Sequence, residues 1–198
     1  MDITGKKMTE DIERWEKKKG IEFMERLGLK SGYQVLDFGA GYGHYTIPAA
    51  KFIGKDGVVY AVDKREEPLS AIAEKVSKYG LSNVKVVKNS DGVTLRFDSD
   101  FIDVVLLFDI LHYMEEEKRN KLYGEVYRVL KPGGKLFVYP KHTRDDFPMG
   151  EFADMRNEDV ADEVQREGLL FDEKICGEIA HDEELDRGCV FKFVKPED

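Results

Sequence analysis

The chain has 198 residues, of which 41% are hydrophobic, and a formal net charge of −9 at pH 7. This length predicts one domain that buries about 70% of its unfolded surface, and the negative charge argues against a nucleic-acid-binding face. No apolar run approaches the ~18 residues that span a membrane, and the charged N-terminus lacks the apolar part of a signal peptide. We therefore expect no membrane partner and a cytoplasmic location.

The cysteine and histidine content argues against two kinds of site. Cys176 and Cys189 are too few for a disulfide framework or a zinc knuckle, and a reducing cytoplasm is the default for such a chain. The four histidines are scattered without the paired spacing of metal ligands, so we predict no metal site.

The N-terminal residues from about 9 to 28 predict one or two helices, with Gly20 as a possible break. Their apolar side chains recur at helical spacing at Ile12, Trp15, Met24 and Leu27. We expect a single domain over residues 1–198, in which residues 1–28 form a helical segment and residues 29–198 form an αβα core.

A glycine-rich turn follows the first predicted strand, at about 33–38. The strand ends in Asp37, and glycines at three alternate positions, Gly39, Gly41 and Gly43, precede a helix expected at about 43–53. Glycine tolerates positive φ and keeps no side chain between the backbone and a ligand. Such a turn lets backbone N–H groups and a helix N-terminus face a nucleotide or a carboxylate.

A second acidic residue, Asp63, ends the next apolar run, which covers residues 58–62. An acid at the tip of the second strand is placed to accept the two hydroxyl groups of a ribose. The glycine turn and Asp63 together predict a cofactor that contains a nucleoside.

Two cofactors compete for this pattern. The nicotinamide fingerprint is G-x-G-x-x-G/A, but here the spacing is G-x-G-x-G and His44 occupies the place of the last Gly or Ala. A bulky His44 would crowd the packing of helix on strand. The carboxylate of Asp37 would repel a pyrophosphate, whereas it suits a cationic ligand with an amino group.

The rest of the chain alternates strands and helices, which predicts a parallel sheet covered by helices on both faces. The predicted strands lie at about 84–88, 102–108, 135–140, 171–180 and 187–195, and the predicted helices at about 68–79, 115–129 and 157–168. Gly80 stops the first of these helices, Asn157 is a plausible N-cap of the last, and Gly168 is its plausible C′ residue. The last two strands predict an antiparallel hairpin at the sheet edge, where a homodimer could form.

The string D-x-G-x-G-x-G, from Asp37 to Gly43, resembles motif I of the class I S-adenosylmethionine-dependent methyltransferases. Asp63 stands at that family's ribose-acid position. The resemblance runs from about residue 20 to 195 and continues through residues 84–91, 101–108 and 111–113, and through the L-K-P-G-G turn that begins at Leu130.

The resemblance implies a Rossmann-like three-layer αβα sandwich, with a seven-stranded, mostly parallel sheet and a C-terminal antiparallel hairpin. It implies a methyltransferase enzyme that transfers the methyl group of S-adenosyl-L-methionine by in-line displacement and leaves S-adenosyl-L-homocysteine. The short segment after the fifth strand holds no large inserted substrate domain, which favours a small-molecule or modest polypeptide acceptor over a duplex nucleic acid. Of the two, we expect a small molecule. The attacking atom stays open among oxygen, carbon, nitrogen and sulfur.

The resemblance also assigns cofactor contacts to particular residues. Asp37 would bind the ammonium group, and Asp63 the ribose. Lys64 would lie beside adenine, Phe108 would line the pocket near the sulfonium, and Asn89 would belong to the adenine loop. The residues implied for the turn and for the rest of that loop are Gly39, Ala40, Gly41, Tyr42, Gly43, Ser90 and Asp91. This chain departs from the family's Gly-Asp pair in the adenine loop, so either Ser90 or Asp91 would meet the adenine amino group.

Four residues are candidates for the acceptor side. His112 and Tyr113 follow the fourth strand, and Tyr139 and His142 lie at the end of the fifth, where α/β sheets bind ligands. A general base is needed only if the acceptor is protonated at working pH, and His112 is its candidate; a structural role for His112 is the alternative.

Two other functions stay open at this point. One is a nicotinamide-dependent oxidoreductase, against which His44 and the L-K-P-G-G turn count. The other is a non-catalytic relative that binds the cofactor, because binding and turnover use different residues.

Overall fold

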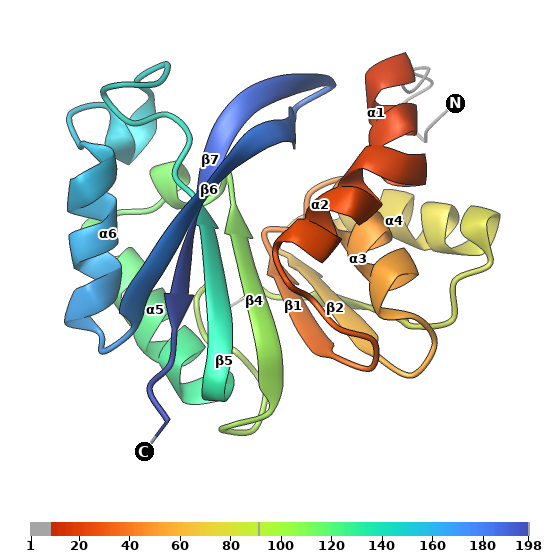
Figure 1. Ribbon diagram of the computed structural model, residues 1–198, viewed down its shortest axis with the longest axis horizontal. Helices are drawn as coiled ribbons and strands as arrows, with labels where there is room; N and C mark the ends of the chain where they lie inside the picture. Colours follow the sequence, from red (N-terminus) through yellow and green to blue (C-terminus); the bar gives the residue numbers. More distant parts are fainter. Residues whose placement is uncertain (1–8, 91, 198) are drawn as a thin grey trace. The chain divides into compact units, whose positions relative to one another are not determined.

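A computed structural model describes residues 9–90 and 92–197. The helices and helical turns are α1 (Glu10–Arg14), η1 (Trp15–Lys19), α2 (Gly20–Arg26), α3 (Thr46–Ile53), α4 (Glu66–Tyr79), η2 (Leu111–Tyr113), α5 (Glu116–Val129), η3 (Gly150–Phe152) and α6 (Asn157–Arg166). The strands are β1 (Gln34–Phe38), β2 (Val58–Asp63), β3 (Val84–Lys88), β4 (Ile102–Phe108), β5 (Leu130–Tyr139), β6 (Leu170–His181) and β7 (Glu184–Val194). Figure 1 shows these elements along the chain.

The fold class predicted from the sequence is confirmed. Seven strands follow the order β3-β2-β1-β4-β5-β7-β6. The pairs β1–β2, β2–β3 and β4–β5 are parallel, and β7 runs antiparallel to β5. A mostly parallel sheet with an antiparallel C-terminal hairpin is what the strand–helix alternation predicted.

Contacts within the chain define two compact units. The first contains the described residues up to Lys88 together with Gly177–Arg187, and the second contains residues 89–176 and those from Gly188 onward. The assignment of residues 1–198 to one domain, with a helical segment over 1–28 and a core over 29–198, stays a prediction.

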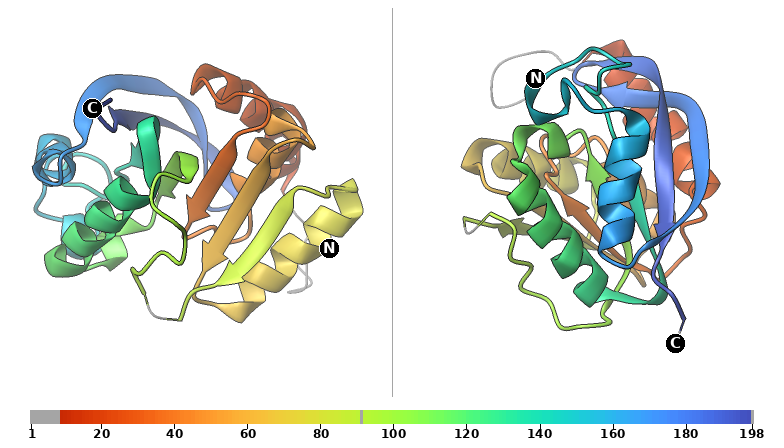
Figure 2. Two further views of the ribbon diagram at one scale, coloured as in Figure 1. Left: turned by 90° about the horizontal axis from the view of Figure 1, so that it is seen from below. Right: turned by 90° about the vertical axis from the view of Figure 1, so that its left-hand side faces the viewer.

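The first unit is built on three parallel strands with their carboxyl ends at one edge. Val35 pairs with Val59, and Val59 with Val84, so the strands lie in register. Helix α3 packs on β2, and α4 packs on β2 and β3, which Figure 2 shows as the helix lying along the outer strand. The interiors of β1 and β2 are buried and mostly apolar, whereas β3 is only partly buried, and the polar end of β2 stands at the edge of this core.

The second unit combines parallel and antiparallel pairing around β5. Phe108 pairs with Tyr139 at the carboxyl ends of β4 and β5, and Lys135 pairs with Val194 of β7. Helix α6 lies alongside α5 in Figure 2, and a buried ion pair joins them, with Arg119 Nη2 at 2.5 Å from Glu163 Oε1.

Several predicted boundaries are wrong by a few residues, for physical reasons. Helix α3 begins at Thr46 rather than near residue 43, because Gly43 has a φ of +81°, which a right-handed helix cannot contain. Strand β5 begins at Leu130 rather than 135, because Gly133 and Gly134 exchange backbone hydrogen bonds with Lys195.

Helix ends follow the expected chemistry with two corrections. Gly20 is not a break, because its φ of −65° is helical and the chain passes through it from η1 into α2. Asn157 is the first helical residue of α6 rather than its N-cap, which is Arg156. Gly80 and Gly168 do end their helices, with φ of +61° and +92°.

Cys176 and Cys189 form a disulfide, which the sequence analysis did not predict. Cys176 lies in β6 and Cys189 in β7, so the bond links the two strands of the predicted hairpin. Among the described residues, no helix has the length and apolar character that crossing a membrane requires.

Candidate functional site

The turn between β1 and α3 needs glycine at all three alternate positions. Gly39, Gly41 and Gly43 have φ of +77°, +50° and +81°, a region that costs about 1–2 kcal/mol for other residues. A Cβ on Gly43 would also lie 2.9 Å from Ile72 Cγ1 of α4. The glycines therefore bring the turn close to α4 as well as bending the backbone.

The N–H groups of this turn are used within the protein. Gly39 and Ala40 both donate to the carbonyl oxygen of Val62, at 2.8 and 3.0 Å. Gly41 donates to Asp63 Oδ2 at 3.1 Å, and Gly43 to the carbonyl oxygen of Ala40 at 2.9 Å. The expectation that the turn's N–H groups face a ligand is wrong for these four. A pyrophosphate would need such donors.

Asp37 is a buried carboxyl beside the turn. It is 3% exposed, and the Thr46 hydroxyl donates to its Oδ2 at 2.5 Å. Burial, together with the smaller effect of the Asp63 charge, raises the pKa of Asp37 to about 6, against the lowering effect of the Thr46 bond. A cation beside Asp37 would reverse this shift, because it stabilises the charged form.

Asp63 stands at the carboxyl end of β2 and points to the same turn. Its Oδ2 accepts the Gly41 N–H, and its Oδ1 accepts the backbone N–H of Arg65 at 2.9 Å. The Arg65 Nε lies 3.3 Å from the same Oδ1. A carboxylate accepts about four hydrogen bonds, so Asp63 retains capacity for a ligand hydroxyl while the backbone holds it in place.

The remaining predicted cofactor residues are more dispersed. In the first unit, the Tyr42 hydroxyl donates to Glu67 at 3.1 Å, and Lys64 is exposed. In the second unit, Asn89 Nδ2 donates to the carbonyl oxygens of Gly92 and Thr94, and its neighbour in the adenine loop, Ser90, is exposed. Asp91 lies outside the described residues. The structure thus brings Asp37, the glycine turn and Asp63 together, and these form the candidate cofactor site of the first unit.

The second unit gathers polar side chains after β4. Phe108 ends that strand, is 5% exposed, and precedes Asp109, which has a φ of +53°. Asp109 Oδ1 lies 3.5 Å from His112 Nδ1 and 3.5 Å from His142 Nε2. The two imidazole rings are 4.5 Å apart. Asp109 was missed by the sequence analysis, although it is the first polar residue after an apolar strand.

The other acceptor-side candidates have different surroundings. Tyr113 is 68% exposed, and its ring lies 3.8 Å from that of His112. Tyr139 is buried, and a Cβ on Gly188 would lie 2.7 Å from its hydroxyl. The structure therefore brings His112 and His142 together with Asp109 and leaves Tyr113 at the surface.

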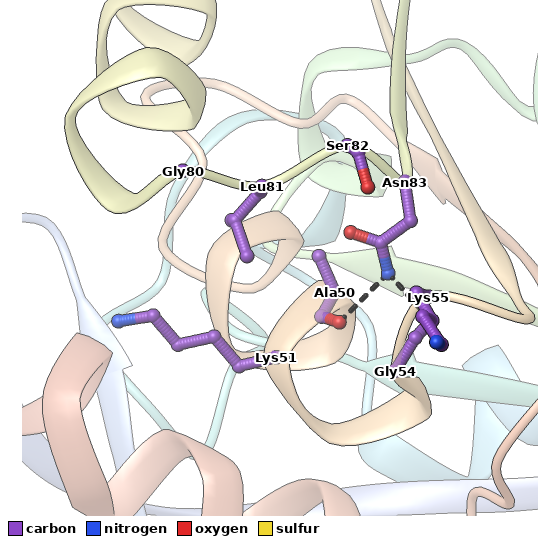
Figure 3. A pocket seen from close by; sticks show the side chains of 8 residues that line it. All are labelled: Ala50, Lys51, Gly54, Lys55, Gly80, Leu81, Ser82 and Asn83. Atoms are coloured by element: carbon purple, nitrogen blue, oxygen red, sulfur yellow. Dashed lines mark hydrogen bonds between the residues drawn. The ribbon is translucent and has the colours of Figure 1, made fainter.

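A separate pocket of about 250 Å³ lies at the opposite edge of the first unit's strands (Figure 3). Asn83, which precedes β3, donates to the carbonyl oxygens of Ala50 and Gly54 at the end of α3, both at 2.8 Å. These bonds satisfy the C-terminal carbonyls of a helix, which is a structural role.

A family model described as "Methyltransferase domain" matches residues 35–134. The ubiquinone/menaquinone biosynthesis C-methyltransferase UbiE of Blochmanniella floridana is 32% identical over 111 residues, 56% of this chain and 42% of that protein. A demethylmenaquinone methyltransferase of Geobacillus sp. is 32% identical over 117 residues, 57% of this chain and 47% of that protein. The match thus spans less than half the length of these curated relatives.

Solved structures share the fold over nearly the whole chain. A SAM dependent methyltransferase from Aquifex aeolicus is 27% identical with a TM-score of 0.75, covering 93% of this chain and 94% of that one. The cyclase SpnF is 15% identical with a TM-score of 0.73, covering 98% of this chain and 86% of that one. At that identity the likeness to SpnF shows the fold alone.

Proposed function

Because the chain belongs to the methyltransferase-domain family, we propose that it transfers a methyl group from S-adenosyl-L-methionine to a small-molecule acceptor. One observation carries the choice of cofactor. The glycine turn keeps its N–H groups for the protein and is flanked by the carboxyls of Asp37 and Asp63. Such a turn suits an ammonium group and a ribose, and it disfavours the pyrophosphate of a nicotinamide cofactor.

The residues present fit this cofactor part by part. Asp37 would hold the ammonium group, and Asp63 would accept a ribose hydroxyl. When bound, the cofactor supplies an electrophilic methyl group on a sulfonium, with a neutral thioether as leaving group. The task of the protein is then to hold the acceptor in line, at about 3 Å from the methyl carbon.

The acceptor class rests on two supports. The relatives from Blochmanniella floridana and Geobacillus sp. carry names that refer to quinone biosynthesis, so a small organic acceptor is consistent with the comparison. In the second unit, His112 and His142 both lie beside Asp109. One of these imidazoles could take a proton from the molecule that receives the methyl group, and the Asp109 carboxylate would stabilise the imidazolium that results.

The experiment is calorimetric titration of the purified chain with S-adenosylhomocysteine. We expect the parent to bind and Asp63→Ala to bind at least about tenfold more weakly, because a hydrogen bond to a charged group contributes about 1.5–3 kcal/mol. The matched control is Asp56→Ala, which removes an exposed carboxylate of the same unit and should bind like the parent. Equal affinity of Asp63→Ala and the parent would remove Asp63 from the site.

A relative that binds the cofactor without transferring a methyl group is the second candidate, because cofactor binding and turnover use different residues. Binding of S-adenosylhomocysteine without methyl transfer across a screen of phenols, thiols, amines and quinols would favour that candidate.

A further inference from the structure

A buried ion pair connects the N-terminal helices to the glycine turn. Glu16 lies in η1 and is fully buried. Lys75 of α4 places its Nζ 2.5 Å from Glu16 Oε1, and the same Nζ donates to the carbonyl oxygen of Tyr42 at 2.9 Å. Lys75 therefore bridges a helix that precedes β1 and the middle of the turn that follows β1.

Trp15, the residue before Glu16, holds a second carbonyl of the same turn. Its Nε1 donates to the carbonyl oxygen of His44 at 2.7 Å, and its indole is fully buried against Tyr45. Trp15 and Glu16 open a π-helical turn, a rare geometry that occurs frequently at functional sites. Two adjacent residues of this π-helical turn are thus linked to the glycine turn, Trp15 directly and Glu16 through Lys75.

Glu16 is held as an anion by its surroundings. Burial raises its pKa, but the neighbouring His44 and the charge and hydrogen bond of Lys75 outweigh burial, so the pKa of Glu16 is lowered overall. The Tyr79 hydroxyl donates to Glu16 Oε2 at 3.0 Å, and Lys51 Nζ donates to the Glu16 backbone oxygen at 2.9 Å. Breaking one partner of such a buried pair leaves an uncompensated charge.

The close approach of the helices supports the same connection. A Cβ on Gly20, in the first turn of α2, would lie 2.6 Å from Pro48 Cγ of α3 and 2.9 Å from Trp15 Nε1. The φ of Gly20 is that of an ordinary helix, so the backbone conformation does not require glycine at this position. Glycine is required because a Cβ would collide with Pro48 and Trp15. The absence of a side chain at Gly20 thus allows α2 to pack closely against α3, the helix that follows the glycine turn.

We propose that Glu16 is a positioning residue for the methyl-donor site, acting through Lys75 on the Tyr42 carbonyl while Trp15 fixes the His44 carbonyl. Each peptide unit is planar, so holding these two oxygens sets the orientation of the peptide units that follow Tyr42 and His44. The identity of the ligand rests on the proposed function, but the effect on the shape of the turn does not.

The first test needs no ligand. Backbone hydrogen exchange is compared between the parent, Glu16→Gln, Lys75→Met and the control Glu22→Gln, which removes an exposed acid of α2. We expect faster exchange of residues 39–46 in the first two variants, with β2 unchanged, and parent behaviour in the control. Unchanged exchange of the turn in folded Glu16→Gln would overturn the proposal.

The double variant Glu16→Gln/Lys75→Met separates positioning from charge compensation. It leaves no buried unpaired charge, so its thermal stability should exceed that of either single variant. The turn should nevertheless exchange faster than in the parent, because the bridge to Tyr42 is gone. Return of the turn to parent exchange rates would mean that Lys75 is needed only to neutralise Glu16, which contradicts the proposal.

The second test measures the dissociation constant of S-adenosylhomocysteine. Glu16→Gln and Lys75→Met should each weaken binding about tenfold, and the double variant should be no weaker than the worse single variant, because both act through one contact. Glu22→Gln should bind like the parent. If the variants lose thermal stability but bind S-adenosylhomocysteine as the parent does, the Glu16–Lys75 pair is purely structural and the proposal is wrong. Failure of the parent to bind would count against the proposed function instead, while the exchange experiment would still decide the role of Glu16.

Discussion

Among the residues of the candidate cofactor site, Asp37 most strongly favours a ligand with an ammonium group over one with a pyrophosphate. It is buried, bonded to Thr46, and has its pKa raised to about 6. A buried acid of this kind is unfavourable in the free protein at neutral pH and becomes favourable when a cation binds beside it. This is the pattern expected of a binding residue, because a purely structural position would be more stable with an uncharged side chain.

The pH dependence of Asp37 follows from the direction of its shift. The folded state binds this proton more tightly than the unfolded state does, so the free energy of unfolding should fall as pH rises from about 4 to about 6. Binding of an ammonium group favours the ionised form, so affinity for S-adenosylhomocysteine should rise over pH 5–7. Calorimetry in two buffers of different ionisation enthalpy should detect proton release near pH 6.

Asp37→Asn is the matched variant for that experiment. It should be at least as stable as the parent at pH 7, because it removes a buried charge. It should bind S-adenosylhomocysteine more weakly and release no proton. A parent whose affinity is flat from pH 5 to 7 would contradict the role given to Asp37.

Gly43 tests the geometry of the turn at a single position. Gly43→Ala combines a left-handed backbone with a Cβ 2.9 Å from Ile72, whereas Gly80→Ala, also left-handed, meets nothing within 4 Å. Urea unfolding should show a loss of about 1–2 kcal/mol for Gly80→Ala and a larger loss for Gly43→Ala. Only Gly43→Ala should also weaken S-adenosylhomocysteine binding. Equal losses in the two variants would mean that contact with α4 does not matter.

At the scale of elements, a buried ion pair joins α5 to α6. Arg119 and Glu163 are each 3% exposed at the side chain and share two hydrogen bonds, at 2.8 and 2.5 Å. Arg119 also donates to the carbonyl oxygen of Met114 at 2.5 Å, which ties the start of α5 to the same group. The pair therefore fixes how two helices of the second unit meet.

Glu163→Gln should lower the free energy of unfolding by about 3–5 kcal/mol, because it leaves the Arg119 charge buried without its partner. Arg119→Met/Glu163→Leu should recover most of that loss, since neither side chain then carries a charge. The control is Glu117→Gln, which breaks an exposed pair with Lys121 on the same helix and should leave denaturant unfolding unchanged. A small effect of Glu163→Gln would show that solvent reaches Arg119.

At the scale of the whole chain, the sequence predicted what depends on local patterns. Residues 102–108 are apolar except for Asp103, and β4 has the bounds predicted from this run. The spacing of Asp37, the glycines and Asp63 indicated the cofactor site because strand ends of a parallel sheet meet at one edge. These features follow from short sequence patterns and from the order of the strands along the chain.

Other features depend on contacts between distant residues, and the sequence did not show them. Glu16 forms an ion pair with Lys75, which lies 59 positions later in the chain. Residues 131–134 have the sequence pattern of a turn, but Gly133 and Gly134 form backbone hydrogen bonds with Lys195 and belong to a strand. Asp109 lies beside His112 and His142, and its backbone has a positive φ that the strand pattern did not predict. Each requires a partner that only the folded chain supplies.

We expect the glycine turn and its two carboxyls to bind a nucleoside that bears a charged amino group. The most direct measurement is titration of the purified chain with S-adenosylhomocysteine at pH 7, with NADH as the competing ligand. We predict binding of S-adenosylhomocysteine and none of NADH, because the N–H groups of Gly39, Ala40, Gly41 and Gly43 are already bonded within the protein. Binding of NADH without S-adenosylhomocysteine would contradict the account and move the search to redox chemistry.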